Sequence, residues 1–450
     1  MTLADRLAQH CARPICAGDR ERASLHLVAW TGAAALAASA PSALPFWQGL
    51  KALSLADDPW HTLLFEASLG SLFEMDDTHR QALVHPAPVI APTALAVARQ
   101  NRASGQATLD AMVRGYEAMI RLGMSVGPTH YRYWHNTSTC GAVGAAITAA
   151  YLLCLSAEQT AHAIRLALVQ TSGLWQTRLD PCDAKPWHLS RTAQTGVQAA
   201  YLAQAGLRGP ALAFEGEKGF FAAACPDARP EMLTAALGGD WQIHATSFKP
   251  WSACRHAHPA IHAALGLRDA WSSQADPLPW TQVRHIEIRT YNDAIAFCDR
   301  PDPIDAAQAR FSLQHGVAVA LCEGAPSPAS FDAPAIANPQ ISTLRKTTCL
   351  AADAEFCQRY PLHFGARVTV YWHNGQCLSH AVHDALGDPE CPLSETALFA
   401  IADSALASAG WQESERHARL AQTCALTQDT TGAGVARLSP LRPRGIPPSS

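Results

Sequence analysis

The sequence predicts a mostly helical protein with a smaller α+β domain inserted late in the chain. Three observations support this fold class. Apolar residues recur at helical spacing through residues 20–260, alternate with period two from about residue 283, and return to helical spacing at 394–423. We therefore expect a discontinuous helical domain of residues 1–265 and 392–430, an α+β lid domain of residues 266–391, and a flexible tail at 431–450.

The predicted helical domain consists of several segments with apolar residues three and four positions apart. These segments are 22–39, 60–73, 93–102, 109–126, 140–155, 157–171 and 191–205. Ser156 followed by Gln159 is a capping-box pattern, which predicts that a helix begins there. Gly206, followed by Gly209 and Pro210, predicts that the preceding helix ends there.

The predicted α+β domain rests on alternating apolar and polar residues. Residues 283–291 alternate in this way and predict a strand. Residues 367–372 and 377–382 flank an Asn374-Gly375 pair, which is a strong signal for a β-hairpin. Between these strands, residues 305–322 are predicted to form one helix with Asp305 as its N-cap.

Composition excludes several classes of protein. Of the 450 residues, 48% are hydrophobic and 16% are charged, so a large core is feasible and extensive disorder is not expected. The net charge of −4 argues against a nucleic-acid partner. The fourteen cysteines form no CxxC pair, which argues against zinc ribbons and thioredoxin-like motifs. The first apolar run, residues 27–40, is too short to cross a bilayer, so we expect a cytoplasmic protein without a membrane partner.

The segment from Lys185 to Arg191 is the strongest functional signal. Lys185, His188 and Arg191 follow one another at intervals of three between two apolar helical segments. Cations in apolar surroundings need an anionic partner, and the local acids are Asp180 and Asp183. A small carboxylate ligand would supply that charge. A structural cluster paired with distant acids is the alternative.

Similar polar islands occur at the ends of other apolar helical segments. Each combines histidine, lysine, arginine or acidic residues with aromatic ones, which favours a shared pocket. The islands are residues 74–80 with His85, residues 130–136, residues 185–191 and residues 249–259.

These motifs, in this order, resemble the MmgE/PrpD family, which contains 2-methylcitrate dehydratase, cis-aconitate decarboxylase and iminodisuccinate epimerase. The motifs are Asp76-Asp77-Thr78 with His85-Pro86, Gly127-Pro-Thr-His130-Tyr131 with His135, Lys185-Pro-Trp-His188, Lys249-Pro-Trp251 with Cys254-Arg-His256-Ala-His258-Pro259, and Ala309-Arg310-Phe311-Ser312. The resemblance covers residues 20 to 420. It implies a helical domain with an inserted α+β lid, a homodimer, and no metal or organic cofactor.

The resemblance also implies a set of site residues. The active-site positions of the decarboxylase branch fall on Glu74, Thr78, His85, His135, Lys185, Lys249, Cys254 and Tyr291. That branch has aspartate where this chain has Glu74 and histidine where it has Cys254, and the interval from Thr78 to His85 is one residue longer here. These departures weaken the decarboxylase interpretation.

Proton removal beside a carboxylate needs a base, an acid and cations that stabilise the developing charge. We expect His135 to be the base, because its ordinary pKa lies near neutrality. The other expected catalytic residues are Lys185, His85, Lys249, Tyr291 and Cys254, and the expected substrate-binding residues are Glu74, Asp77, Thr78, His188, Arg191 and His256. We expect these side chains to line one cleft between the helical domain and the lid.

Several of these residues also have a structural interpretation. His85 before Pro86 is compatible with capping a loop, and His135 with a packed core histidine. Asp76 and Asp77 are compatible with pairing to Arg80, and Cys254 with a small buried hydrophobe. His256 and His258 resemble a metal pair, but no third ligand stands at a typical spacing, so no metal is expected.

The leading functional hypothesis is a cofactor-independent lyase that dehydrates a small di- or tricarboxylate in the manner of 2-methylcitrate dehydratase. An epimerase of an iminodisuccinate-like substrate is the alternative, because epimerisation needs only proton removal and return. A cis-aconitate decarboxylase and a non-catalytic carboxylate-binding protein are the remaining possibilities.

Overall fold

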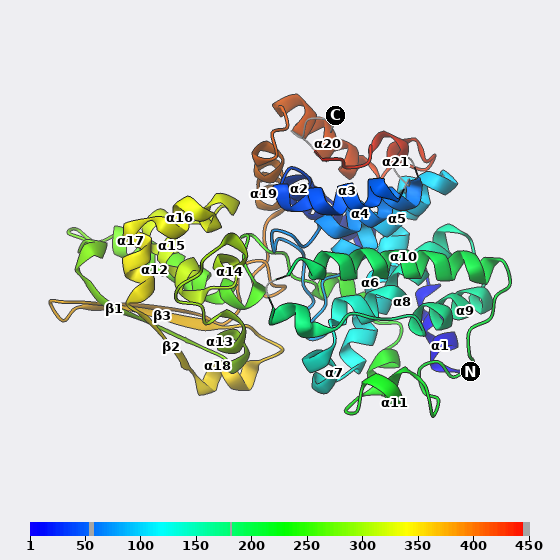
Figure 1. The fold of residues 1–450 in the computed structure, drawn as a ribbon, viewed down its shortest axis with the longest axis horizontal. Coiled ribbons are helices and arrows are strands. Elements are labelled where there is room, and N and C mark those ends of the chain that lie inside the picture. The colour runs from blue at the N-terminus through cyan, green and yellow to red at the C-terminus, as the bar shows by residue number, and fades with distance from the viewer. Residues whose placement is uncertain (54–57, 181, 444–450) are drawn as a thin grey trace. The chain divides into compact units, whose positions relative to one another are not determined.

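The computed structural model describes residues 1–53, 58–180 and 182–443. The chain forms two compact units. The helical unit contains Met1–Leu72, Asp76–Thr246 and Ser394–Ser450, and the α+β unit contains Phe73–Met75 and Ser247–Leu393. The predicted class, mostly helical with a smaller α+β part, is confirmed (Figure 1).

The helical unit is built around α8 (Asn136–Leu152), which is rich in alanine and glycine and buried along nearly its whole length. It packs against α5 (Ala87–Asn101), α6 (Gly105–Ser125), α9 (Ala157–Leu168) and α10 (Ala184–Gln204) (Figure 1). The remaining helices of the unit are α1 (Leu3–Cys11), α2 (Ala17–Ala38), α3 (Leu44–Ala52), α4 (Pro59–Leu69), α7 (Pro128–Tyr133), α11 (Phe220–Ala224), α19 (Glu395–Ser408), α20 (Glu413–Ala425) and α21 (Ala433–Arg437).

Small residues let the central helices approach closely. A β-carbon added at Gly144 on α8 would lie 2.8 Å from the carbonyl oxygen of Gly115 on α6. Only glycine fits such an approach of two backbones. Because other helices pack around α8, it has no polar stripe like that of a surface helix.

The helices predicted in the helical domain are all present, with some shifted ends. Ser156 and Gln159 form the expected capping box at the start of α9. The largest shift concerns α10, which begins at Ala184 rather than at residue 191. Lys185 and His188 therefore lie in the first turns of this helix, at the positive end of its dipole.

The α+β unit contains a four-stranded sheet in the order β2-β1-β3-β4. β1 (Val283–Thr290) runs parallel to β2 (Thr348–Ala352) and antiparallel to β3 (Ala366–Trp372), which forms the predicted hairpin with β4 (Cys377–Val382). α12 (His258–Ser272) packs on β3 and β4, and α15 (Leu313–Glu323) packs on α12 and α17 (Pro339–Lys346) (Figure 1). The other helices are α13 (Asn292–Cys298), α14 (Ala306–Arg310), α16 (Ala333–Ala337) and α18 (Ala354–Arg359).

The single helix predicted at residues 305–322 is wrong. Asp305 does cap a helix, by accepting a hydrogen bond from the backbone N–H of Gln308, but α14 ends at Arg310. Ser312 then adopts an extended conformation, and its hydroxyl accepts from the backbone N–H of His315 to begin α15. A second N-cap inside the apolar pattern divides the helix, and hydrophobic spacing does not reveal it.

The domain limits also differ from the predicted ones. The α+β unit begins at Ser247 rather than at residue 266, because α12 packs on the sheet. The start of the predicted flexible tail is ordered: α21 forms, and Leu438 and Leu441 are buried. The backbone N–H of Leu441 donates to Glu66 at 3.0 Å. Residues 444–450 of that tail lie outside the described residues.

No single helix among the described residues is long and apolar enough to cross a membrane. Residues Ala17–Ala38 and Pro41–Ala52 have the length and apolar composition of a membrane span only when they are combined, and an 87° bend separates them. Most of Ala17–Ala38 is buried inside the helical unit, as expected for a core helix.

Candidate active site

The helical unit brings His135, His188 and Lys185 together at the N-terminal ends of two helices. His135 is the N-cap residue of α8, and Lys185 and His188 lie in the first turns of α10. The Nδ1 atoms of His135 and His188 are 3.4 Å apart. Ser138 on α8 and Thr192 on α10 join the two helices through hydroxyl groups 2.9 Å apart. Two helix N-termini and a lysine make a region that favours an anion.

His135 is held rigidly and is neutral at physiological pH. Its ring stacks on the indole of Trp175, with centroids 4.4 Å apart and planes within 5°. Burial, together with the charges of Lys185, His188 and His85, holds its pKa well below the ordinary range, and Asp76 opposes this effect. Its Nε2 atom is buried and has no hydrogen-bond partner among the described residues. A neutral, buried imidazole with one such nitrogen is suited to accept a proton from a bound molecule.

His85 is fixed by three oxygen atoms around its Nδ1 atom. The carbonyl oxygen of Asp77 lies 2.7 Å away, the hydroxyl of Thr78 3.0 Å and the carboxylate of Asp76 3.4 Å. The backbone N–H of His85 donates to the hydroxyl of Thr137 on α8, which ties this loop to the helix that carries His135. The helical unit thus brings together His85, His135, Lys185 and His188, with Asp76 and Thr78 beside them.

Asp77 has a supporting role in the structure rather than the expected role in substrate binding. One of its carboxylate oxygens accepts from the hydroxyl of Tyr116 at 2.6 Å and lies 2.8 Å from Nδ1 of His26. The other accepts from the backbone N–H of Ala87 at 2.9 Å, at the start of α5. Asp76, its neighbour, is the aspartate that faces His85. A sequence pattern does not distinguish two adjacent aspartates. The conformation of the loop decides which of them faces His85.

Lys185 and Arg191 do not share one environment. Lys185 is half-buried and its charge acts on His135, whereas Arg191 is exposed. The Arg191 guanidinium hydrogen-bonds Gln194 and lies 5.8 Å from the ring of Trp187. Each step of three residues on a helix falls 60° short of a full turn, and two steps carry Arg191 away from the face that holds Lys185. The structure therefore gives no support to Arg191 as a substrate ligand.

The α+β unit holds a buried lysine–carboxylate pair. The Nζ atom of Lys249 lies 3.4 Å from the carboxylate of Glu74, and the Lys249 side chain is fully buried. Glu74 has a φ of 53°, in the left-handed region that side chains other than glycine adopt at a cost. A strained backbone that presents a buried charge is typical of functional sites.

Cys254 lies beside this pair and contacts a second thiol, Cys298. A hydrogen bond from Cys298 lowers the pKa of the Cys254 thiol, burial and Glu74 oppose this, and Lys249 adds to it. Burial and the neighbouring thiol raise the pKa of Cys298 well above its usual value. Cys254 is therefore more than a small core side chain. Cys298 is absent from the predicted set, because an isolated cysteine on a helix carries no sequence signal.

His256 and Tyr291 form a hydrogen-bonded pair in an aromatic box of the same unit. Nδ1 of His256 and the hydroxyl of Tyr291 are 2.8 Å apart. Phe364 stacks on His256, with centroids 5.3 Å apart, and Tyr360 stacks on Tyr291 at 4.6 Å. Burial raises the pKa of Tyr291 well above its usual value, so its phenol stays protonated and can donate a hydrogen bond or a proton.

His256 and His258 do not form the metal pair that their spacing resembles. His256 is committed to Tyr291, while Nε2 of His258 lies 3.0 Å from the carbonyl oxygen of Ala253. The buried ring of His258 also lies 3.3 Å from the Arg255 guanidinium, and burial and this charge hold its pKa well below the ordinary range. A ring beside a fixed cation is a poor site for a metal ion.

Comparison with known proteins gives a consistent family assignment. The model of the MmgE/PrpD N-terminal domain matches residues 57–233, and that of the C-terminal domain matches residues 251–425. A cis-aconitate decarboxylase-like protein of Aspergillus oryzae, oryM, is 26% identical over 345 residues, which is 72% of this chain and 71% of that protein.

Two further relatives are cis-aconitate decarboxylases. The Homo sapiens protein is 28% identical over 280 residues, 60% of this chain and 57% of the relative. The Aspergillus terreus protein is 22% identical over 336 residues, 70% of this chain and 68% of the relative. Because the two domain models together match most of the chain, this protein belongs to the MmgE/PrpD family.

Proposed function

We propose that this protein is a lyase that acts on a small di- or tricarboxylate by moving a proton at a carbon beside a carboxylate group, and that it needs no cofactor. The observation that carries the proposal is the neutral, buried ring of His135 at the positive ends of α8 and α10, next to Lys185. The decarboxylase names of the relatives support the lyase class.

Dehydration of a hydroxy-tricarboxylate of the 2-methylcitrate type is our first candidate. Nε2 of His135 takes the proton from the carbon, and the electron pair forms the new carbon–carbon double bond as the carbon–oxygen bond breaks. His85, positioned by Asp76, gives a proton to the departing hydroxide, which leaves as water. Lys185 and the two helix N-termini stabilise the negative charge that develops on the substrate carboxylate.

Decarboxylation of cis-aconitate is the second candidate, and the names of the relatives favour it. This reaction breaks a carbon–carbon bond to carbon dioxide and needs an acid that protonates the remaining carbon. A histidine whose pKa is held well below neutrality carries no proton to donate at neutral pH, so the environment of His135 favours a reaction in which this ring accepts a proton first.

Proton NMR in deuterated water separates the possibilities. Citrate, 2-methylcitrate, cis-aconitate and iminodisuccinate isomers are incubated with the enzyme in turn. A new alkene without loss of carbon dioxide supports dehydration, and release of carbon dioxide supports decarboxylation. Deuterium that enters the substrate without an alkene supports epimerisation. Thermal stabilisation by these compounds without any turnover would show a binding protein and contradict the proposal.

A further inference from the structure

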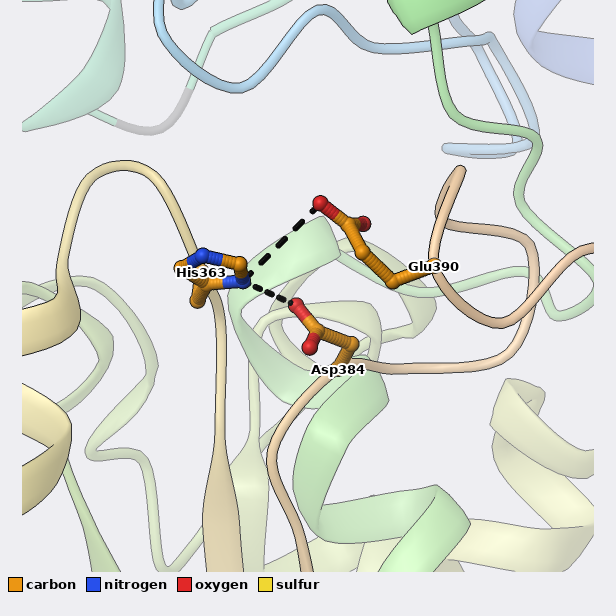
Figure 2. A group of neighbouring side chains, drawn as sticks. All are labelled: His363, Asp384 and Glu390. Atoms are coloured by element: carbon orange, nitrogen blue, oxygen red, sulfur yellow. Dashed lines mark hydrogen bonds and ion pairs between the residues drawn. The ribbon is translucent and has the colours of Figure 1, made fainter.

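Three potential metal ligands meet near the end of the sheet in the α+β unit where β3 begins and β4 ends, apart from the pairs described above. They are His363, Asp384 and Glu390, and Figure 2 shows their side chains pointing toward one another. Nδ1 of His363 lies 2.8 Å from Oδ1 of Asp384 and 3.9 Å from Oε1 of Glu390. All three donor atoms lie within 4.8 Å of one another.

The three donors come from three segments, each anchored separately. His363 lies between α18 and β3, and the next residue, Phe364, is buried against His256. Asp384 follows β4. Glu390 lies in a turn that the buried carboxylate of Asp388 holds by accepting from the backbone N–H of Ala385 at 3.0 Å. The backbones that carry the donors are thus fixed by contacts other than those among the donors.

We propose that His363, Asp384 and Glu390 bind a divalent cation of the manganese or zinc type. One imidazole nitrogen and two carboxylate oxygens are a common donor set for such ions, with water completing the coordination. Donors at about 2.1 Å from an ion stand roughly 3.0–3.4 Å apart, and the two measured distances bracket this range. Small side-chain rotations therefore close the site. The side chains are 33%, 14% and 39% exposed, so an ion can reach them.

Proton and charge balance both permit binding. When Nδ1 of His363 coordinates the ion, Nε2 of the ring carries the proton, as in other histidine ligands. The two carboxylates contribute negative charge, and one cation beside them is Arg359, whose guanidinium lies 3.6 Å from Oδ2 of Asp384. Arg359 competes with a metal ion for Asp384. A variant that lacks the Arg359 charge should therefore bind the ion more tightly.

The test is a titration of the full-length protein with Mn²⁺, followed by electron paramagnetic resonance of the free ion. Manganese is chosen because the chain contains fourteen cysteines, which bind soft ions instead. We expect one binding site that His363→Ala and Glu390→Gln each weaken by about 10-fold or more, the loss of about 1.4 kcal/mol per tenfold step. Arg359→Gln should tighten the same site.

His383→Ala is the matched control. His383 is an exposed histidine next to Asp384 in sequence. Its ring lies 3.2 Å from Glu355 and is not one of the three proposed ligands, so this variant should bind Mn²⁺ as the wild type does. Thermal melting without metal checks that each variant is folded. Equal binding by wild type and a folded His363→Ala would overturn the proposal, and so would an Arg359→Gln variant that binds more weakly than the wild type.

Discussion

Lys185 is the single side chain whose position most clearly separates a catalytic from a structural role. It is half-buried, so its removal exposes little core. We predict that Lys185→Ala lowers turnover by more than about 100-fold, roughly 3 kcal/mol of transition-state stabilisation, and leaves the melting temperature nearly unchanged. Arg191→Ala, on the same helix but exposed, should keep most of the activity. Near-normal turnover with a large drop in melting temperature would show that Lys185 is structural.

The low pKa of His135 predicts the acid limb of the pH profile. The active, neutral ring predominates at every pH above its lowered pKa, so the loss of kcat/KM on the acid side should begin only below pH 6.5. A loss on the alkaline side would report the proton donor, His85. Removing the positive charge of Lys185 should raise the pKa of His135. The acid limb of the residual activity in Lys185→Ala is therefore expected at higher pH. An acid limb at or above pH 6.5 in the wild type would contradict His135 as the base.

The buried pair of Lys249 and Glu74 predicts a stability effect. In Lys249→Met the carboxylate of Glu74 stays buried without this cation, and such a change costs about 3–5 kcal/mol. Thermal unfolding should show a lower melting temperature, and adding Glu74→Gln should recover much of it, because the uncompensated charge is then removed. A double variant that is no more stable than Lys249→Met would show that the loss comes from packing alone.

Sequence patterns identify residue types better than the exact residue that faces a ligand. The segments around His85, His135 and Lys185 were predicted, and the structure brings these residues together with His188. The pattern did not separate Asp76 from Asp77, because their difference arises from the loop conformation. Cys298 was missed for a similar reason, since its contact with Cys254 depends on how α13 packs.

At the scale of elements, the close approach of α6 and α8 makes a sharp prediction. A methyl group at Gly144 would lie 2.8 Å from the Gly115 carbonyl oxygen and 2.9 Å from side-chain atoms of Ile90 and Met119. Gly144→Ala should therefore destabilise the protein by about 1–3 kcal/mol in chemical denaturation. Gly49→Ala on α3 is the control, because a β-carbon there meets nothing within 4 Å. Removing a helical glycine at such a place should be neutral or slightly stabilising.

Most helices and strands were predictable because their hydrophobic period is unambiguous over several turns. The predicted strand at residues 283–291 is β1, and Asn374-Gly375 does join β3 to β4. The predictions fail where a local contact, rather than the hydrophobic period, decides where an element begins or ends. The Ser312 cap divides α14 from α15, and buried Leu441 orders a segment rich in proline and arginine that composition alone marks as flexible.

At the scale of the whole molecule, the helical unit exposes an unusual set of large apolar side chains. Tyr133, Leu174, Leu179, Trp187 and Leu212 are each 45–71% exposed. The elements that carry them are neighbours, since the 3₁₀ turn at Trp175–Arg178 packs against α7 and α10, and Trp134 pairs with Leu174. Trp134 and Leu212 both line a cavity of about 480 Å³. Apolar patches of this kind on soluble proteins mark interfaces.

We propose that a second copy of the chain covers this surface, giving a homodimer. The exposed apolar side chains of the patch would meet their own copies across a two-fold axis, which suits an interface between two identical chains. Light scattering at micromolar concentration should give twice the chain mass of 48.1 kDa. The double variant Leu174→Glu and Leu179→Glu should dissociate the dimer, because it places like charges against each other, and its circular dichroism should match the wild type since both side chains are exposed. A wild-type protein that stays monomeric would contradict the proposal, and so would a double variant that remains dimeric.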